Sequence, residues 1–220
     1  MTQTVAELVA FLTERLAAPL PGPTAQRRFA PVPHLDWWAP DDEPATARRA
    51  AALVLIFPGQ MGPAIALTER HADLPHHPGQ ISLPGGGLLP GESPRAAALR
   101  EAEEEIGVPA PDVRLLGALS SLWIPVSNFI LTPFVGVTDQ MPLFVPHPRE
   151  VAAIIETPIA RLRDRTAIRW SSRDRRGQSI EFPYFDVDGR TVWGATAMVL
   201  SEFTCLWDAD HGPDPLKAAP

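Results

Sequence analysis

Three glutamates at helical spacing are the residues of this sequence whose types and positions are best suited to chemistry. Glu101, Glu104 and Glu105 follow a loop rich in glycine. At about 100° per residue they share one face of a helix, whereas Glu103 points away from them. Like charges this close repel each other, and no lysine within residues 94–106 offsets them. Two interpretations remain: a solvated acidic surface, or a face that binds a hard divalent cation through oxygen ligands.

The helix that carries these glutamates has recognisable ends. Ser93 is a good N-cap, Pro94 suits the first helical position, and Gly107 is a typical C-terminal stop. Its apolar stripe, which we expect to pack on a sheet, consists of Ala98, Leu99, Ala102 and Ile106. In the preceding loop, Gly85, Gly86, Gly87 and Gly91 have no Cβ that would keep backbone groups from a phosphate or an ion. Taken alone, the glycines fit an ordinary mobile loop equally well.

The stretch from Gly86 to Val108 has the pattern G-x5-E-x7-R-E-U-x-E-E-x-G-U, where U is apolar. This pattern resembles the Nudix box at every fixed position. The resemblance implies a Nudix hydrolase, which cleaves a diphosphate linked to another moiety with the help of a divalent cation, Mg²⁺ or Mn²⁺. It further implies that the metal ligands are Glu101, Glu104, Glu105 and the carbonyl of Gly85. Arg100 and Glu92 would form an ion pair that holds the loop on the helix.

A second segment is similar to the one that coenzyme A pyrophosphatases carry before the Nudix box. The matching residues are Leu67-Thr68-Glu69-Arg70, Leu74, His77, Gly79 and Pro84-Gly85-Gly86, with departures at Ala66, His71, Leu83 and Leu89. Residues 193–197 also look like the start of that group's C-terminal helix. The resemblance implies hydrolysis of coenzyme A or acyl-coenzyme A to a phosphopantetheine and adenosine 3',5'-bisphosphate. The alternatives are a Nudix hydrolase of ADP-ribose, a dinucleotide or a nucleoside triphosphate, and a catalytically silent module that binds a nucleotide.

Candidate roles follow for residues inside and outside the box. The guanidinium of Arg70 matches phosphate oxygens, so we expect it to bind substrate at the 3'-phosphate, although a surface ion pair explains it equally well. His77 could contact a phosphate or hydroxyl, or could hold a tight turn. Water is the expected nucleophile, and its general base is either a helix carboxylate or Glu150. The candidate catalytic residues are Arg100, Glu104, Glu105 and Glu150; the candidate substrate-binding residues are Arg70, His77, Gly85 and Gly86.

Composition limits the partners and the compartment. The chain has 220 residues, a net charge of −7, a hydrophobic fraction of 45% and one cysteine, Cys205. The negative charge argues against nucleic-acid binding, and a single cysteine excludes an internal disulfide. No secretory signal and no membrane span is evident. We expect a cytoplasmic enzyme that binds a small-molecule diphosphate and no membrane.

We expect the elements that must position these residues to form an α+β sandwich of helix, mixed sheet and helix. The expected helices are residues 3–18, 93–107, 158–163 and an amphipathic one at 195–207; the expected strands are residues 51–58, 64–69, 80–83, 113–122, 128–137, 151–155, 181–186 and 191–193. The last two strands flank Asp188-Gly189, a strong hairpin signal.

The predicted domain arrangement has three parts. Residues 1–45 form the N-terminal helix and a Pro-rich arm that we expect to be extended, 46–207 the hydrolase domain, and 208–220 a flexible tail. Trp37 and Trp38 in the arm require burial. They could close over the ligand, pack against a second subunit in a homodimer, or dock on the surface of the domain itself.

Overall fold

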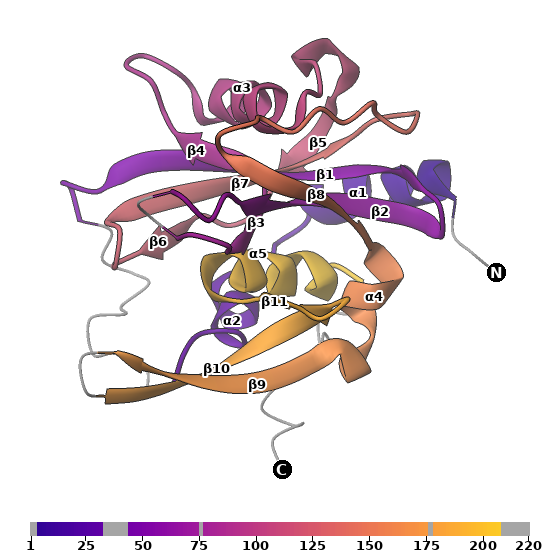
Figure 1. The fold of residues 1–220 in the computed structure, drawn as a ribbon. Coiled ribbons are helices and arrows are strands. Elements are labelled where there is room, and N and C mark those ends of the chain that lie inside the picture. The colour runs from indigo at the N-terminus through magenta and orange to yellow at the C-terminus, as the bar shows by residue number, and fades with distance from the viewer. Residues whose placement is uncertain (1–3, 33–43, 75–76, 176–177, 208–220) are drawn as a thin grey trace.

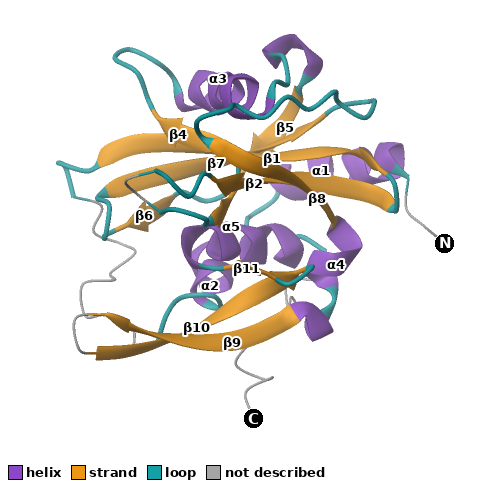
Figure 2. Cartoon of the chain, viewed as in Figure 1, coloured by secondary structure: helices purple, strands orange, loops and turns teal. Residues whose placement is uncertain are grey.

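A mixed sheet between two helices forms the centre of the molecule (Figures 1 and 2). The computed structural model describes residues 4–32, 44–74, 77–175 and 178–207. Trp37, Trp38 and the predicted tail lie outside the described residues. Helix α3 (Pro94–Ile106) covers one face of the sheet, and α5 (Gly194–Cys205) lies on the other. The predicted α+β sandwich is therefore confirmed.

The central sheet has eight strands, and its strand order is β3-β2-β1-β7-β5, with β4, β6 and β8 paired to β1, β7 and β2. The strands are β1 (Arg48–Gly59), β2 (Gly62–Arg70), β3 (Ile81–Ser82), β4 (Gly85–Gly87), β5 (Arg114–Ala118), β6 (Leu122–Ile124), β7 (Phe129–Val137) and β8 (Val151–Pro158). The pairing of β1 with β7 is parallel, whereas the other pairings are antiparallel. The sheet is mixed for this reason.

Strand β1 is apolar throughout its middle because both faces of the sheet are covered. Val54 and Ile56 point into the core on the α5 side, and Leu53 and Leu55 point into the core under α3. Alternation along the strand thus divides one apolar run between two cores. On α3 the residues that face the sheet are mostly alanines, which lets the helix lie close to β1 and β4.

A second, three-stranded sheet lies beyond α5 and consists of β9 (Ile168–Arg175), β10 (Gln178–Val187) and β11 (Arg190–Val192). The hairpin predicted at Asp188-Gly189 is confirmed, with both residues at positive φ of 52° and 79°. Strand β9 was not predicted, because its arginines and serines give no apolar alternation. Helix α5 is buried all round from Ala197 to Cys205, so the amphipathic character expected for it is wrong. The central sheet and the small sheet cover opposite sides of this helix, so water is excluded from both sides of the helix.

The N-terminal region joins the same core. Helix α1 (Val5–Ala17) begins with a capping box between Thr4 and Glu7 and buries Leu8 and Leu12. The Pro-rich segment is not extended throughout as expected, because Gly22–Arg27 form the short helix α2. Prolines are tolerated in a first helical turn, where the N–H groups have no partner within the helix.

Helix α2 is anchored by a buried carboxylate of α5. Glu202 accepts hydrogen bonds from the Gly22 N–H at 3.2 Å and from Gln26 Nε2 at 2.8 Å. Phe29 then stacks on Phe185 of β10, with ring centroids 4.3 Å apart. These contacts fix the N-terminal region against both α5 and the small sheet.

Short helical segments form part of the remaining connections. The 3-10 helix η1 (Ala110–Asp112) follows α3, and α4 (Ile159–Arg163) and η2 (Arg165–Ala167) lead from the main sheet to the small one. In the described parts of the chain, no helix combines the length and hydrophobicity needed to cross a membrane.

Candidate active site

Helix α3 has the ends that the sequence predicts. The hydroxyl of Ser93 accepts a hydrogen bond from the Ala96 N–H at 3.2 Å. Gly107 adopts φ of 72° and donates its N–H to the carbonyl of Glu103. A left-handed C-cap favours glycine, since it lacks the Cβ that strains this conformation. Both caps fix the ends of the helix that carries the glutamates.

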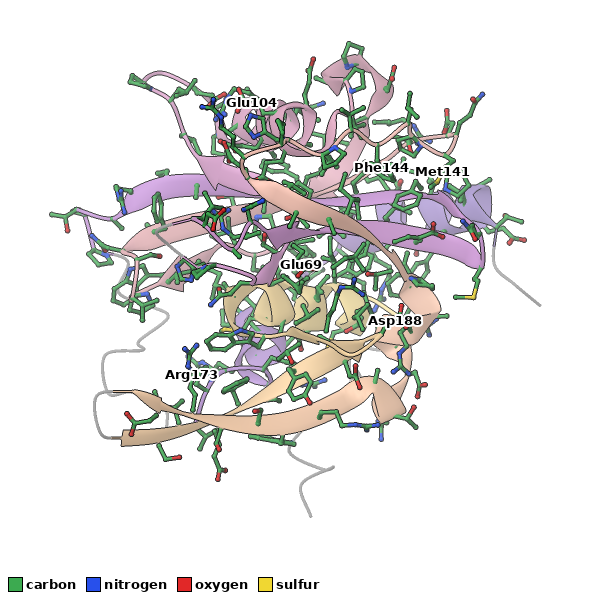
Figure 3. All side chains as sticks on the ribbon, viewed as in Figure 1. Glu69, Glu104, Met141, Phe144, Arg173 and Asp188 are labelled. Atoms are coloured by element: carbon green, nitrogen blue, oxygen red, sulfur yellow. The ribbon has the colours of Figure 1, made fainter. Side chains whose placement is uncertain are left out.

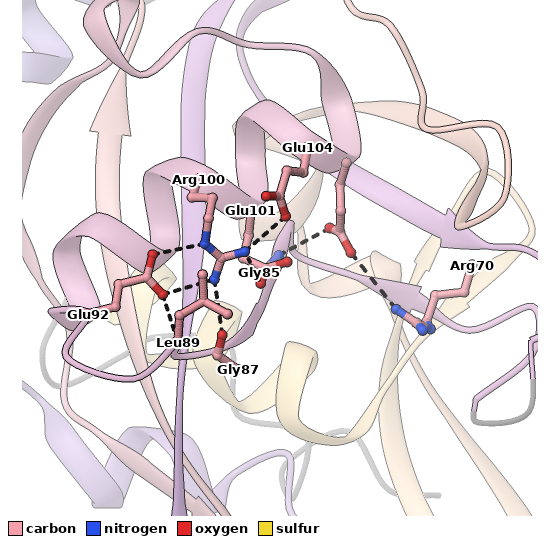
Figure 4. A network of polar contacts seen from close by, with 9 residues as sticks. Arg70, Gly85, Gly87, Leu89, Glu92, Arg100, Glu101 and Glu104 are labelled. Atoms are coloured by element: carbon pink, nitrogen blue, oxygen red, sulfur yellow. Dashed lines mark hydrogen bonds and ion pairs between the residues drawn. The ribbon is translucent and has the colours of Figure 1, made fainter.

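Arg100 is the centre of a hydrogen-bond network at the start of the site (Figure 4). Its Nε and Nη2 donate to the two carboxylate oxygens of Glu92 at 2.8 and 3.0 Å, and Nη2 also donates to the Gly87 carbonyl at 3.1 Å. Its Nη1 donates to Glu101 at 2.7 Å and to Glu104 at 2.9 Å. The hydrogen bond from Arg100 lowers the pKa of Glu92. The loop before α3 is thereby held on the helix by a bidentate ion pair.

Glu105 is the buried member of the carboxylate face. Its side chain is only 6% exposed, and its Oε1 lies 3.9 Å from Nη1 of Arg70. Its Oε2 accepts a hydrogen bond from the Gly85 N–H at 3.1 Å. Burial raises the pKa of Glu105 to about 7, with the charges of Glu101 and Glu150 acting in the same direction. Helical spacing alone suggested that the glutamate face is separate from the buried face of α3. The burial of Glu105 shows that the two faces overlap.

Glu101 lies against the glycines of β4. Its pKa is raised, mainly because burial penalises the charged carboxylate, while Arg100 opposes this shift. A Cβ on Gly86 would come within 2.5 Å of the Glu101 carboxylate, and a Cβ on Gly85 would come equally close to the Ala51 carbonyl. Gly85 and Gly86 are thus required by close packing. Residues 85–87 pair with β1 as a strand, so the alternative of an ordinary mobile loop is wrong for them.

Glu104 and Glu103 are both exposed, but their side chains lie on different faces of α3. Glu104 is oriented toward Arg100, whereas Glu103 accepts a hydrogen bond from the Ala110 N–H at 3.3 Å. The prediction that Glu103 points away from the other three glutamates is consistent with these contacts.

The donor set suits a divalent cation in chemical type. Burial raises the pKa values of Glu101 and Glu105, and repulsion from neighbouring carboxylates, Glu104 and Glu150 for the first and Glu101 and Glu150 for the second, adds to it. A cation bound among these carboxylates would relieve that repulsion. Across the described ranges, no three histidine, cysteine, aspartate or glutamate side chains are already gathered into a metal site. In this conformation Arg100 holds Glu101 and Glu104. Arg100 thus occupies one oxygen of each of these two carboxylates.

Glu150 lies near the carboxylate face although it is distant in sequence. Its negative charge contributes to the raised pKa values of both Glu101 and Glu105. It immediately precedes β8, and its Oε1 is 3.8 Å from Nδ1 of His147. The backbone N–H of His147 donates to the carbonyl of Glu105 at 2.9 Å, which ties this turn to α3.

A pocket of about 750 Å³ opens beside Gly85, Gly86 and Gly87 and extends toward the small sheet. Arg70 lines it and has a buried Nε with no hydrogen-bond partner. His77 also lines it, with an exposed side chain and a backbone φ of 57°. The carbonyl of His77 accepts from the Gln80 N–H at 3.2 Å, so this residue does form the predicted tight turn.

The opposite wall of the pocket was not predicted from sequence. It is formed by residues of β9 and β10 and by the start of α5, namely Arg173, Asp174, Ile180, Trp193, Gly194, Ala195 and Thr196. Only the similarity of residues 193–197 to a known helix start pointed to this region. The remaining wall comes from β6, β7 and their connection, with Ile124, Val126, Ser127, Phe129 and Leu131. The pocket is thus mostly apolar, with arginine side chains on two sides.

Comparisons with known proteins show which family and fold this chain resembles. The NUDIX domain model matches residues 47–174. An uncharacterized Nudix hydrolase named NudL from Photorhabdus laumondii is 34% identical over 155 residues, which cover 70% of this chain and 82% of that protein. NudL from Pectobacterium atrosepticum is 33% identical over 164 residues, which cover 74% and 85%. The crystal structure of RenU, a Nudix hydrolase from M. smegmatis, shares the fold, with a TM-score of 0.52, 20% identity and coverage of 75% and 88%.

Proposed function

The chain belongs to the NUDIX domain family and is a Nudix hydrolase, and from this premise we propose that it hydrolyses the diphosphate of coenzyme A or an acyl-coenzyme A. The products would be a phosphopantetheine and adenosine 3',5'-bisphosphate. The observation that carries the proposal is the continuity of the carboxylate face of α3 with a large, mostly apolar pocket. A diphosphate at Gly85 would leave room in that pocket for a bulky organic arm.

The segment that resembles coenzyme A pyrophosphatases contributes directly to this pocket. Arg70, His77 and Gly85 all line it. Arg70 lies 3.9 Å from Glu105, and its buried Nε has no partner, so its guanidinium is available to a phosphate oxygen next to the carboxylates. This position supports a role at the diphosphate itself more than at a remote 3'-phosphate.

Glu101, Glu104, Glu105 and the Gly85 carbonyl are the proposed holders of Mg²⁺ or Mn²⁺. When bound, such a cation neutralises the charge of a diphosphate and lowers the pKa of a water molecule. Glu92 and Arg100 keep the glycine strand in contact with α3. Gly86, without a Cβ, leaves the Glu101 carboxylate space next to the strand.

The attacking water requires a group that accepts its proton. Glu105, with a pKa of about 7, and Glu150, with its side chain 47% exposed, are the two candidates that the site brings near each other. We propose Glu150 as the base, because Glu105 is hydrogen-bonded to Gly85 and faces Arg70.

A substrate panel tests the proposal. Coenzyme A, acetyl-coenzyme A, ADP-ribose, a dinucleoside polyphosphate and a nucleoside triphosphate are each incubated with the enzyme and Mg²⁺ or Mn²⁺. We expect adenosine 3',5'-bisphosphate to be released from coenzyme A with the highest kcat/KM. Preference for another diphosphate would overturn the proposed substrate. Absence of metal-dependent turnover of any of them would instead indicate a nucleotide-binding module.

A further inference from the structure

Arg173 lies on the wall of the pocket that is contributed by the small sheet. It pairs with Ile180 across the antiparallel β9–β10 ladder. Directly paired residues project to the same side of a sheet, so Arg173 shares the side of Ile180, a buried residue that also lines the pocket. Asp174 borders the pocket too, but alternation along the strand directs it to the other side. The exposed side chain of Arg173 is thus placed to meet a ligand.

Aromatic packing holds the guanidinium of Arg173 in place. Its Cζ lies 5.0 Å from the ring centroid of Trp193, and Trp193 packs on Phe182 with ring centroids 4.6 Å apart. Phe182 is 5% exposed and is fixed in the small sheet. An arginine stacked on an aromatic ring still presents the edge of its planar group to an anion. Because its conformation is already restricted, it loses less entropy when it binds a phosphate.

The two arginines among the described pocket residues occupy different ends. Arg70 lies 3.9 Å from Glu105, on the carboxylate side, whereas Arg173 belongs to β9. Figure 3 shows Arg173 and Glu104 on opposite sides of the central sheet. The lining also includes the apolar residues Ile124, Leu131 and Ile180. A ligand that fills the pocket would therefore meet one cation at its diphosphate and a second cation at a distance from it.

We propose that Arg173 is a specificity-determining residue that binds a phosphomonoester on the ribose of the nucleotide arm. This inference rests on the proposed function, because it assumes that the diphosphate lies at the carboxylate face. Coenzyme A carries such a group at the 3' position and NADP carries one at the 2' position. A charge-assisted contact from a pre-organised arginine discriminates either compound from its analogue without the phosphate.

The first test measures kcat/KM for coenzyme A and for 3'-dephospho-coenzyme A, with NADPH and NADH as a second pair. Arg173→Ala should lower the value for the phosphorylated member of the preferred pair by about tenfold, mainly through KM, because a hydrogen bond to a charged group is lost. The value for the other member should fall much less. Arg114→Ala, which removes an exposed cation paired with Asp139 outside the pocket, is the matched control. Equal losses for both members, or no loss, would overturn the role of Arg173.

A binding measurement separates this inference from the choice of substrate. Adenosine 3',5'-bisphosphate, adenosine 2',5'-bisphosphate and AMP are titrated calorimetrically into the wild-type protein and Arg173→Ala. We expect the wild type to prefer one bisphosphate over AMP by about tenfold and the variant to bind both alike. This result would support Arg173 even if coenzyme A were not hydrolysed. Equal affinities of the wild type for all three nucleotides would refute the inference even if coenzyme A were hydrolysed.

Discussion

Replacement of Glu105 by glutamine should stabilise the metal-free protein at alkaline pH while it abolishes turnover. The Glu105 side chain is 6% exposed, and burial raises its pKa from an ordinary value of 4.5 to about 7. Each pH unit by which a pKa is raised corresponds to about 1.4 kcal/mol. The ionised carboxylate therefore costs the folded state about 3 kcal/mol above pH 7.

The sign of this effect follows from proton linkage. Since the folded-state pKa is raised, the folded protein binds a proton at Glu105 more tightly than the unfolded chain does. The stabilising contribution is fully present below about pH 4.5 and is lost as the pH rises through about 7. Glutamine is neutral at every pH and can still accept the hydrogen bond from Gly85. Its NH₂ group would face Arg70, which costs about 1 kcal/mol, so we expect a net gain of about 1–3 kcal/mol at pH 8.

Thermal unfolding in EDTA between pH 5 and pH 8.5 measures this difference. For a chain of this length, about 2 kcal/mol corresponds to a rise in Tm of about 4–8 °C. The gap between Glu105→Gln and the wild type should be small at pH 5 and largest above pH 7. Added Mg²⁺ should raise the Tm of the wild type at pH 8 and have little effect on the variant. A variant that is less stable than the wild type at pH 8, or a gap independent of pH, would refute the reasoning.

Four further predictions concern single side chains. Glu101→Gln should stay folded by circular dichroism and lose most of its turnover at saturating metal, and near wild-type rates would remove Glu101 from the proposed ligands. Glu103→Gln should be nearly silent, since its exposed side chain accepts a hydrogen bond from the Ala110 N–H, which a glutamine can also accept; a loss of turnover like that of Glu101→Gln would mean that the helix faces are assigned wrongly. Arg70→Ala should lower kcat/KM for coenzyme A and 3'-dephospho-coenzyme A equally, by about ten- to a hundredfold, and selective loss on coenzyme A would return the 3'-phosphate role to Arg70. Glu150→Gln should lower kcat by about a hundredfold or more while KM changes little, and a near wild-type kcat would assign the base to another residue.

The local features of the box could be predicted from the sequence. Ser93 and Gly107 define the ends of α3 because capping depends on residue type and on backbone conformation within a single turn. The common face of the three glutamates follows from helical periodicity. The apolar run that became β1 was recognisable as a strand, and Asp188-Gly189 as a hairpin, for equally local reasons.

Tertiary structure alone decided the environment of these groups. Helical spacing could not show that Glu105 would be buried beside Gly85 and Arg70, because burial depends on what packs against the helix. The short helix α2 lies in a proline-rich segment. The N–H of its first residue, Gly22, donates a hydrogen bond to the carboxylate of Glu202, which is 180 residues away in sequence. Arg173 reaches the pocket only because β9 pairs with β10 beyond α5. Such contacts are set by the free energy of packing whole elements together, which no local stretch of residues encodes.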